Sequence, residues 1–366
     1  MLMPSPATIV SLQQRLLGWF SANARPLPWR ERYQPYQVWV SEIMLQQTQM
    51  ERGVVYFRRW LERFPGIEAV AAASEEEILK HWEGLGYYSR ARNIQAAAKQ
   101  IMCDFDGSLP DSLSALFALP GIGKYTARAI LSIAFQQDFP VVDGNVERLF
   151  ARLFAIDEPV KSPATHARIW GLAELLLPQG QAREWNQALM EFGALVCGRG
   201  VPRCGFCPLT AVCQSFQTGT MALRPVSGGG QKRVHVSFVA AVIVAEKLIY
   251  VQQRRPGTRW ASLWEFPGGQ LEDGESPAEA VIREVQEETE FAIDIQIPLP
   301  VVTHAYTKYK AIVYPFLCRL PSLAIPILHA AQDFRWLPLS ELDALAFSSG
   351  HRQVVGHLQK QPSFIK

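Results

Sequence analysis

The sequence lacks the features of a membrane or exported protein. Its longest purely apolar run, residues 238–245, is far shorter than the ~20 residues that a membrane-spanning helix requires. The first residues contain no basic stretch followed by a cleavable apolar core, so no export signal is predicted. We therefore expect a cytoplasmic protein that does not contact membranes.

An excess of one charge is also lacking. Lysine and arginine number 36 against 34 aspartates and glutamates, for a net charge of +2. Bulk basicity therefore does not indicate nucleic-acid binding, and any such contact must come from local clusters and backbone groups.

Two regions of different pattern divide the 366 residues, a length that favours two domains. Apolar residues recur at helical spacing from residue 9 to residue 213, whereas β-branched runs follow residue 233. We predict an all-α domain over residues 1–217, a glycine-containing linker over 218–232, and an α+β domain over 233–366. In that last domain we expect one helix near 276–290 and strands near 234–245, 248–253, 311–319 and 334–337.

Four cysteines are clustered, in the spacing C-x6-C-x2-C-x5-C. Short connections allow four sulfurs to converge on a tetrahedral metal or a cubane iron–sulfur cluster, and the spacing alone leaves zinc open. In a cytosolic protein, clustered cysteines more often bind a metal than form disulfides. The predicted ligands are Cys197, Cys204, Cys207 and Cys213. The isolated Cys103 and Cys318 are expected to be buried apolar residues.

A glycine turn lies between two helical patterns at residues 119–127 (LPGIGKYTA). Gly121 and Gly123 would let backbone N–H groups face a phosphate beside a helix N-terminus, with Lys124 following. A simple corner between two helices is the alternative for a Gly-x-Gly pair alone.

The nine residues as a block resemble the helix-hairpin-helix of the endonuclease III superfamily of DNA glycosylases. Four further segments resemble the adenine DNA glycosylase (MutY) family in the family's order: 26–30 (PLPWR), 42–49 (EIMLQQTQ), 84–90 (GLGYYSR) and 142–146 (VDGNV). The resemblance implies a helix-hairpin-helix glycosylase domain in which the four cysteines hold a [4Fe-4S] cluster.

Two carboxyl groups are the minimum equipment for cutting an N-glycosidic bond, because the base must be protonated and the sugar cation stabilised. Glu42 precedes apolar residues on a predicted helix, so burial would raise its pKa and make it the acid, as the resemblance implies. Asp143 precedes a glycine where a helix could start and hold its charge, and it would face the sugar cation. On residue type alone, a helix cap or a surface charge is the more common explanation of each carboxylate, and the resemblance reverses that preference.

Tyr125 occupies the position where family members that also cleave the DNA backbone carry a Schiff-base lysine. Lys124 is one residue earlier, roughly 100° away around a helix. We therefore predict a monofunctional glycosylase, with Tyr125 hydrogen-bonded to Asp143 and Asn145 placing the sugar or water. An endonuclease III-like glycosylase is the disfavoured alternative.

Excision requires the base to leave the helix, so a side chain must fill the gap. Gln47 and Tyr87 are the candidates by their match to family residues, because an amide or a ring can pair or stack with the remaining base. Tyr88 is expected to be a core aromatic residue.

A second motif lies in the C-terminal half, where Gly269-(x5)-Glu275-(x7)-Arg283-Glu284-Val285-Gln286-Glu287-Glu288 resembles the Nudix box of MutT-type hydrolases. Glu284, Glu287 and Glu288 share one helix face, where they could bind Mg²⁺ and a pyrophosphate. A solvated acidic helix is the alternative. Glu290 stands where the Nudix box usually has a glycine. Thr307 stands where the glycosylase family has the loop that reads 8-oxoguanine, and its hydroxyl could contact the oxidised base.

The sequence therefore predicts a monomeric repair enzyme that removes adenine paired with 8-oxoguanine or guanine in double-stranded DNA, associated with the nucleoid when acting. Three alternatives remain: a bifunctional protein that also hydrolyses oxidised nucleoside triphosphates, a nucleotide-pool hydrolase tethered to a DNA-binding half, and a catalytically silent DNA-binding scaffold. Adenine release that depends on Glu42 would exclude the tethered hydrolase, and turnover of 8-oxo-dGTP with Mg²⁺ would test the bifunctional protein.

Overall fold

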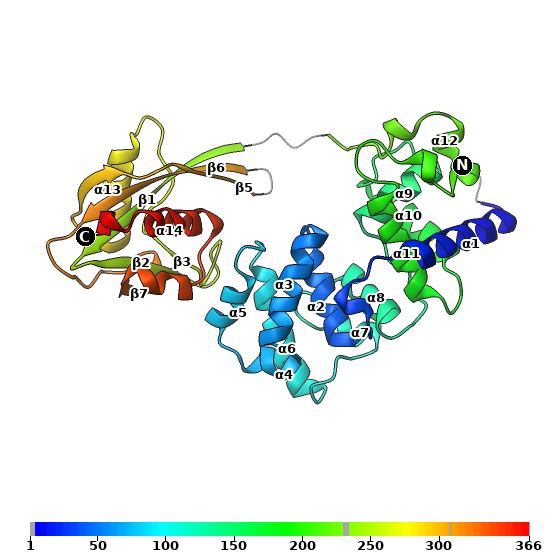
Figure 1. Cartoon of the computed structure of the whole chain (residues 1–366), viewed down its shortest axis with the longest axis horizontal. Helices are drawn as coiled ribbons and strands as arrows, with labels where there is room; N and C mark the ends of the chain where they lie inside the picture. The colour runs from blue at the N-terminus through cyan, green and yellow to red at the C-terminus, as the bar shows by residue number, and fades with distance from the viewer. Residues whose placement is uncertain (1–3, 230–233, 307–308, 366) are drawn as a thin grey trace. The chain divides into compact units, whose positions relative to one another are not determined.

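The computed structural model describes residues 4–229, 234–306 and 309–365, and within it the chain forms two compact units (Figure 1). One unit comprises Met1–Ala71 and Ala96–Gly230, and the other comprises Ala72–Gln95 and Gln231–Lys366. The second unit therefore includes a short helical segment, residues 72–95, from the region in which we expected only the first domain.

The region before residue 230 is helical, as predicted, and its described residues contain no β-strand. Serines start several of these helices: Ser5, Ser74 and Ser162 each accept a backbone N–H bond as N-cap residues. The helices are α1 (Pro6–Asn23), α2 (Pro35–Leu45), α3 (Met50–Arg63), α4 (Ile67–Ala72), α5 (Glu75–Trp82), α6 (Ser89–Asp104), α7 (Leu113–Phe117), α8 (Lys124–Ile133), α9 (Gly144–Leu153), α10 (Pro163–Leu176), α11 (Ala182–Leu195) and α12 (Gln214–Gln217), with 3-10 turns η1 (Pro28–Arg30), η2 (Cys204–Phe206), η3 (Thr210–Val212) and η4 (Met221–Leu223).

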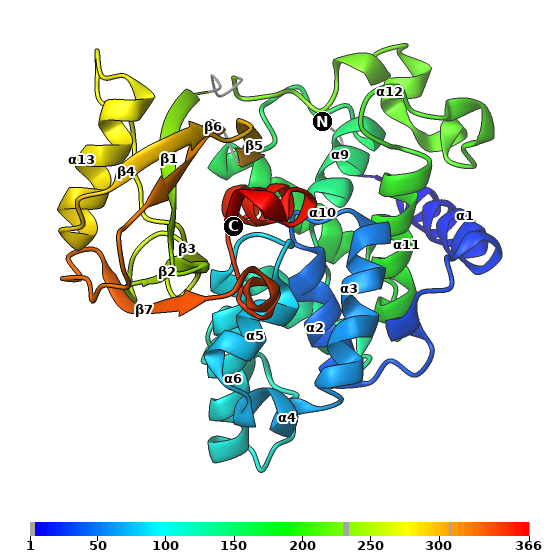
Figure 2. The ribbon, with the colours of Figure 1, turned by 60° about the vertical axis from the view of Figure 1, so that its left-hand side comes forward.

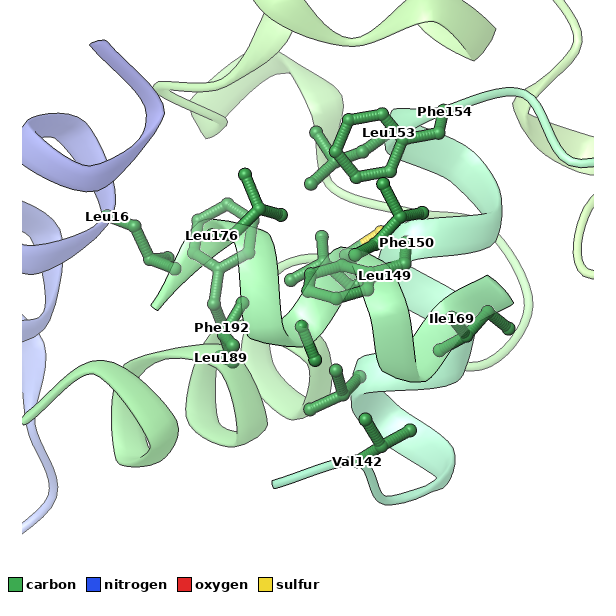
Figure 3. Packing of buried hydrophobic residues seen from close by; sticks show 14 of the residues in the cluster. Leu16, Val142, Leu149, Phe150, Leu153, Phe154, Ile169, Leu176, Leu189 and Phe192 are labelled. Atoms are coloured by element: carbon green, nitrogen blue, oxygen red, sulfur yellow. The ribbon is translucent and has the colours of Figure 1, made fainter. Parts of the chain in front are cut away.

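The core of the first unit forms between α1, α9, α10 and α11. Figure 3 shows Leu16, Phe150 and Phe192 from three of these helices, all fully buried. Gly193 allows α11 to approach α9 closely, because a Cβ there would lie 2.8 Å from the Cβ of Asn145. This packing holds the N-terminal end of α9, where Asp143 and Asn145 lie, against a rigid support.

The second unit contains a mixed sheet of seven strands. Their order is β3-β2-β1-β6-β4, with β5 paired to β6 and β7 paired to β2; β1 and β6 are parallel. The strands are β1 (Val234–Ala245), β2 (Leu248–Arg254), β3 (Trp264–Glu265), β4 (Asp294–Pro298), β5 (Val302–Tyr306), β6 (Tyr309–Arg319) and β7 (Ala331–Leu337), accompanied by α13 (Pro277–Thr289), η5 (Leu339–Ala344), α14 (Ser349–Lys360) and η6 (Pro362–Ile365).

Alternate residues of β1 pack into two different hydrophobic cores. Val239, Ala241 and Ile243 pack with α13, whereas Val242 and Val244 pack with the cluster that includes α14. Figures 1 and 2 show these two helices on opposite faces of the sheet. Burial on both faces explains why residues 238–245 are continuously apolar.

The observed elements correct two expectations. We predicted one helix in the C-terminal domain, but α14 is a second, because residues 349–360 carry their apolar side chains in a short pattern that we did not assign. Cys318 is buried as expected, whereas Cys103 is exposed near the end of α6.

The start and end of α13 agree with its sequence signals. Ser276 and Glu279 form a capping box at the start of the helix, and Glu290 ends it in the left-handed conformation at φ 60°. Glu290 carries the side chain that this conformation disfavours, and its carboxylate contacts His329 at 2.8 Å. In the described part of the chain, no helix has the length and apolar composition needed to cross a bilayer.

Candidate functional site

Glu42 lies on α2 with its side chain buried, at 7% exposure. Its Oε2 accepts a hydrogen bond from the Tyr125 hydroxyl at 2.8 Å. Burial raises the pKa of Glu42 to about 7, and the nearby charge of Asp143 raises it as well, while Tyr125 and Arg30 oppose the rise. The carboxyl can therefore carry a proton near neutral pH, as its apolar neighbours predicted.

Asp143 is the N-cap residue of α9. Its Oδ1 accepts hydrogen bonds from the backbone N–H groups of Asn145 and Val146, at 2.9 and 2.8 Å. The Asn145 side chain donates to Oδ2 at 2.7 Å. Burial raises the pKa of this carboxyl, and the three hydrogen bonds oppose that rise because they stabilise the charged form.

Arg148 contacts Asn145 beside Asp143, and the sequence did not identify it as a site residue. Its Nη2 donates to Asn145 Oδ1 at 2.8 Å, which orients the Asn145 amide so that its nitrogen faces Asp143. Its charge also lowers the pKa of Asp143. The available signal was spacing, because Arg148 follows Asn145 by three residues on the same helix face.

Our prediction that Tyr125 bonds Asp143 is wrong, because the hydroxyl donates to Glu42 instead. Both Asp143 oxygens already accept bonds from Asn145 and Val146, whereas the buried Glu42 needs a donor. Burial, followed by the charge of Glu42, raises the pKa of Tyr125 well above its ordinary value, so the phenol remains a donor.

The predicted hairpin lies between α7 and α8. Gly121 has a φ of 77°, which favours glycine, and Gly123 is the N-cap residue of α8; both are exposed. Lys124 is also exposed, and its Nζ lies 4.0 Å from the centre of the Trp170 ring. The turn therefore presents its backbone outward, as phosphate binding requires.

Gln47 and Tyr87 share an unusual backbone conformation. Gln47 has a φ of 56° and Tyr87 a φ of 48°, and both side chains are exposed. Left-handed conformations in residues other than glycine cost of order 1–3 kcal/mol and cluster at functional sites. The sequence alone could not reveal this strain. Tyr88, by contrast, is buried, as expected.

The four clustered cysteines line one cavity in the first unit, together with Arg152. Arg152 donates from Nη1 to the Cys197 sulfur at 3.5 Å. Burial raises the pKa of the Cys207 thiol to about 11, and the charges of the other three sulfurs raise it as well.

In the described residues, no group of three or more histidine, cysteine, aspartate or glutamate side chains is placed to hold a single metal ion. A cubane cluster makes a different demand, because each thiolate binds its own iron corner rather than one common point. The cavity offers four thiols beside the guanidinium of Arg152, and four is the number of ligands that a cubane cluster requires.

The acidic face of α13 is partly neutralised by Arg283. Its Nη1 donates to Glu284 at 3.0 Å and to Glu287 at 3.2 Å, and its Nε donates to Glu275 at 2.8 Å. Glu288 points elsewhere, and its Oε2 accepts from the Gly268 N–H at 2.9 Å. The structure thus brings Glu284 and Glu287 to one arginine, whereas Glu288 accepts from the backbone at Gly268 instead.

A cavity of about 1030 Å³, its open side included, lies in the second unit. Glu265, Glu284 and Glu288 all line it, and the sequence did not identify Glu265. Burial, with repulsion from Glu265, raises the pKa of Glu288 to about 8. Thr307, the predicted contact to an oxidised base, lies outside the described residues.

Two family models match the chain. The model described as HhH-GPD superfamily base excision DNA repair protein matches residues 40–174, which include Glu42, Tyr125 and Asp143. The NUDIX domain model matches residues 239–357.

Relatives and a solved structure agree with these matches. An adenine DNA glycosylase of Rattus norvegicus is 32% identical over 410 residues, covering 95% of this chain and 78% of the rat protein. An adenine DNA glycosylase of Buchnera aphidicola subsp. Schizaphis graminum is 34% identical over 261 residues, covering 71% of this chain and 75% of that protein. A thermostable thymine-DNA glycosylase structure superimposes with a TM-score of 0.54 at 27% identity, covering 58% of this chain and 98% of that one.

Proposed function

This chain belongs to the adenine DNA glycosylase family, and we propose that it hydrolyses the N-glycosidic bond of adenine paired with 8-oxoguanine or guanine in duplex DNA. The observation that supports this most strongly is a buried Glu42 whose pKa is about 7 and on which the charge of Asp143 acts. Two carboxyls with different duties are what the reaction needs.

Glu42 is the general acid of the proposed reaction. It donates its proton to the ring of the extruded adenine, so the base leaves as a neutral molecule. Tyr125 orients the carboxyl through the 2.8 Å hydrogen bond. The pKa near 7 keeps a large fraction of Glu42 protonated at neutral pH while leaving it acidic enough to release the proton.

Asp143 stabilises the positive charge that develops on the sugar as the base leaves. Its backbone and Asn145 hydrogen bonds favour the charged form, and Arg148 fixes the Asn145 amide. Water then attacks C1′ of the sugar, and the product is an abasic site. Asn145 helps to position the sugar or that water.

The test of the proposed function is release of free adenine from a duplex that carries one 8-oxoguanine·adenine pair. A duplex of the same sequence with a thymine·adenine pair is the control. We expect release from the first duplex, slower release from a guanine·adenine pair, and none from the control. Equal release from all three, or no release, would exclude this function.

The hydrogen bond from Tyr125 to Glu42 should determine the pH above which the rate of adenine release falls. Replacing Tyr125 with phenylalanine removes a bond that stabilises ionised Glu42, so the pKa of Glu42 rises. A hydrogen bond to a charged group contributes about 1.5–3 kcal/mol, and about 1.4 kcal/mol corresponds to one pH unit. The falling limb of the rate against pH should therefore move up by about one unit.

Single-turnover rates measured from pH 5 to 9 would test this shift. Tyr33→Phe is a suitable control, because the Tyr33 hydroxyl accepts a hydrogen bond from Gln187 in the same unit. A downward shift, or an equal shift in the control, would contradict the assignment of Glu42 as the acid.

The proposed enzyme is monofunctional. Tyr125 has no amine, and the exposed Lys124 lies over Trp170. Incubation with substrate DNA and borohydride should therefore trap no covalent complex above the level of a Lys124→Ala variant. Efficient trapping that disappears in this variant would mean that Lys124 forms a Schiff base.

The double-stranded DNA partner is bound, in this proposal, by the hairpin backbone at Gly121 and Gly123 with support from Lys124. Gln47 and Tyr87 fill the space left by the extruded base, and their exposed, left-handed positions support that role. The protein acts as a monomer.

A [4Fe-4S] cluster held by Cys197, Cys204, Cys207 and Cys213 is the proposed cofactor, and it orders the loop that contains these residues. The purified protein should contain about four irons and four sulfides per chain. A Cys207→Ser variant should lose them, whereas Cys318→Ser should keep them. Zinc in place of iron would refute this proposal.

Nucleotide hydrolysis is a second candidate function, favoured by Glu284 and Glu288, which line the cavity of the second unit. Glu284, Glu287 and Glu288 would hold Mg²⁺ after Arg283 releases the first two. Turnover of 8-oxo-dGTP with Mg²⁺, compared with Glu287→Gln, tests this activity. No turnover above that variant would eliminate it.

A further inference from the structure

The loop that carries Tyr87 is attached to the C-terminal part of its own unit. This Tyr87 loop comprises residues 83–88, between α5 and α6. Arg352, on α14, donates from Nε to Glu83 Oε1 at 2.7 Å and from Nη2 to Oε2 at 3.2 Å. The two side chains are only 25% and 13% exposed, so this two-point ion pair is largely shielded from water.

A second attachment uses the backbone of Phe347. The Tyr88 hydroxyl donates to the Phe347 carbonyl at 3.0 Å, and the Phe347 N–H donates to Glu83 Oε1 at 3.0 Å. Tyr88 and Phe347 are both buried. We call Glu83, Tyr88, Phe347 and Arg352 the clasp.

The clasp holds both ends of a strained loop. Tyr87 is exposed by 41% and left-handed, and it lies directly before Tyr88. Arg90 also supports the loop, because its Nη2 donates to the carbonyls of Leu85 and Gly86. A strained conformation persists only where surrounding contacts determine it, and the clasp supplies such contacts.

We propose that Glu83 and Arg352 are positioning residues for base excision, acting through the clasp to hold Tyr87 in the conformation that enters the DNA. This inference rests on the proposed function. It makes the C-terminal part of the second unit a contributor to base extrusion, although the acid and the sugar-stabilising carboxylate belong to the first unit.

The same short segment also faces the cavity of the second unit. Ser348, Gly350 and His351 line that cavity, between the clasp residues Phe347 and Arg352. The Phe266 N–H donates to His351 Nδ1 at 3.2 Å, which ties the segment to the sheet. The segment therefore connects the cavity wall to the Tyr87 loop.

A double-mutant cycle tests the proposal in the full-length protein. Arg352→Met removes the guanidinium and keeps an aliphatic chain, and Tyr87→Ala removes the ring. We expect Arg352→Met to lower the rate of base extrusion about tenfold, and to have no further effect in the Tyr87→Ala background, because coupled residues are not additive. Stopped-flow fluorescence of 2-aminopurine in place of the target adenine reports unstacking of the base, which precedes excision.

Arg335→Met is the matched control. Arg335 pairs with Glu76 of α5 at 3.2 Å, so it also joins residues 72–95 to the C-terminal part, but it lies outside the segment 347–352. We expect extrusion by this variant to match the wild type. Tyr88→Phe, which removes only the hydroxyl, should reproduce the effect of Arg352→Met.

Three outcomes would overturn the proposal: additive losses in the cycle, a wild-type rate in Arg352→Met, or an equal loss in Arg335→Met. Thermal unfolding identifies any variant that loses rate through misfolding, and Tyr88→Phe then provides the decisive comparison. The fluorescence measurements can show that the effects of Arg352→Met and Tyr87→Ala are not additive while the wild type releases no adenine. In that case the proposed reaction fails and the positioning role of the clasp stands.

Discussion

Replacing Glu42 with glutamine should lower the single-turnover rate of adenine release by about 10²- to 10⁴-fold, the range that a general acid contributes. Glutamine has nearly the same shape, and its amide oxygen can still accept the hydrogen bond from Tyr125. It has no proton to donate at any pH in the working range. The loss should therefore appear in the chemical step, with DNA affinity retained.

Glu147→Gln is the matched control for this variant. Glu147 is also a buried glutamate of the first unit, but it pairs with Lys161 at 2.8 Å and its carboxylate has no place in the proposed reaction. Adenine release by Glu42→Gln within tenfold of the wild type would mean that another group donates the proton. Any nucleotide hydrolysis by the second unit should be unchanged in Glu42→Gln, so this variant separates the two candidate activities.

Replacing Asp143 with asparagine should lower the rate of adenine release by about 10²- to 10³-fold, the magnitude typical of a lost electrostatic contact to the transition state. The substitution removes the negative charge that would oppose the sugar cation. It keeps an oxygen for the N–H groups of Asn145 and Val146, and asparagine caps helices about as well as aspartate. Activity should therefore fall while α9 remains folded.

Thermal unfolding and rate measurements together separate the charge of Asp143 from its capping role. The melting temperature should fall by only a few degrees, which corresponds to about 1 kcal/mol. Asp138→Asn is a control, because Asp138 also accepts a backbone N–H, from Gly180 at 3.0 Å. A rate loss no larger than the loss of folded protein would refute the electrostatic role of Asp143.

Local signals in the sequence predicted much of the fold. The boundaries of β1 and the capping box of α13 follow from residue type and spacing within one element. The residue that starts α9 was predicted on the same basis, since Asp143 caps its own helix. Burial of Glu42 could be predicted because its neighbours on α2 are apolar.

Contacts between distant residues could not be predicted in the same way. The Tyr125 hydroxyl donates to Glu42 on another helix, whereas Asp143 accepts from residues at the start of its own helix. The arginine that neutralises Glu284 and Glu287 is a further case, because its rotamer depends on Glu275, eight residues away. The clasp joins residues more than 250 positions apart, so no local pattern contains it.

The amino-acid sequence by itself determined the two domain types, the glycine hairpin, the four clustered cysteines and the pair of acidic residues, because each depends on residue identity over a short span. Tertiary structure alone decided which donor serves Glu42, how Asn145 is oriented, and that residues 72–95 join the C-terminal unit. The physical reason is that hydrogen-bond donors and buried charges pair across the fold, where the lowest free energy depends on every neighbour at once.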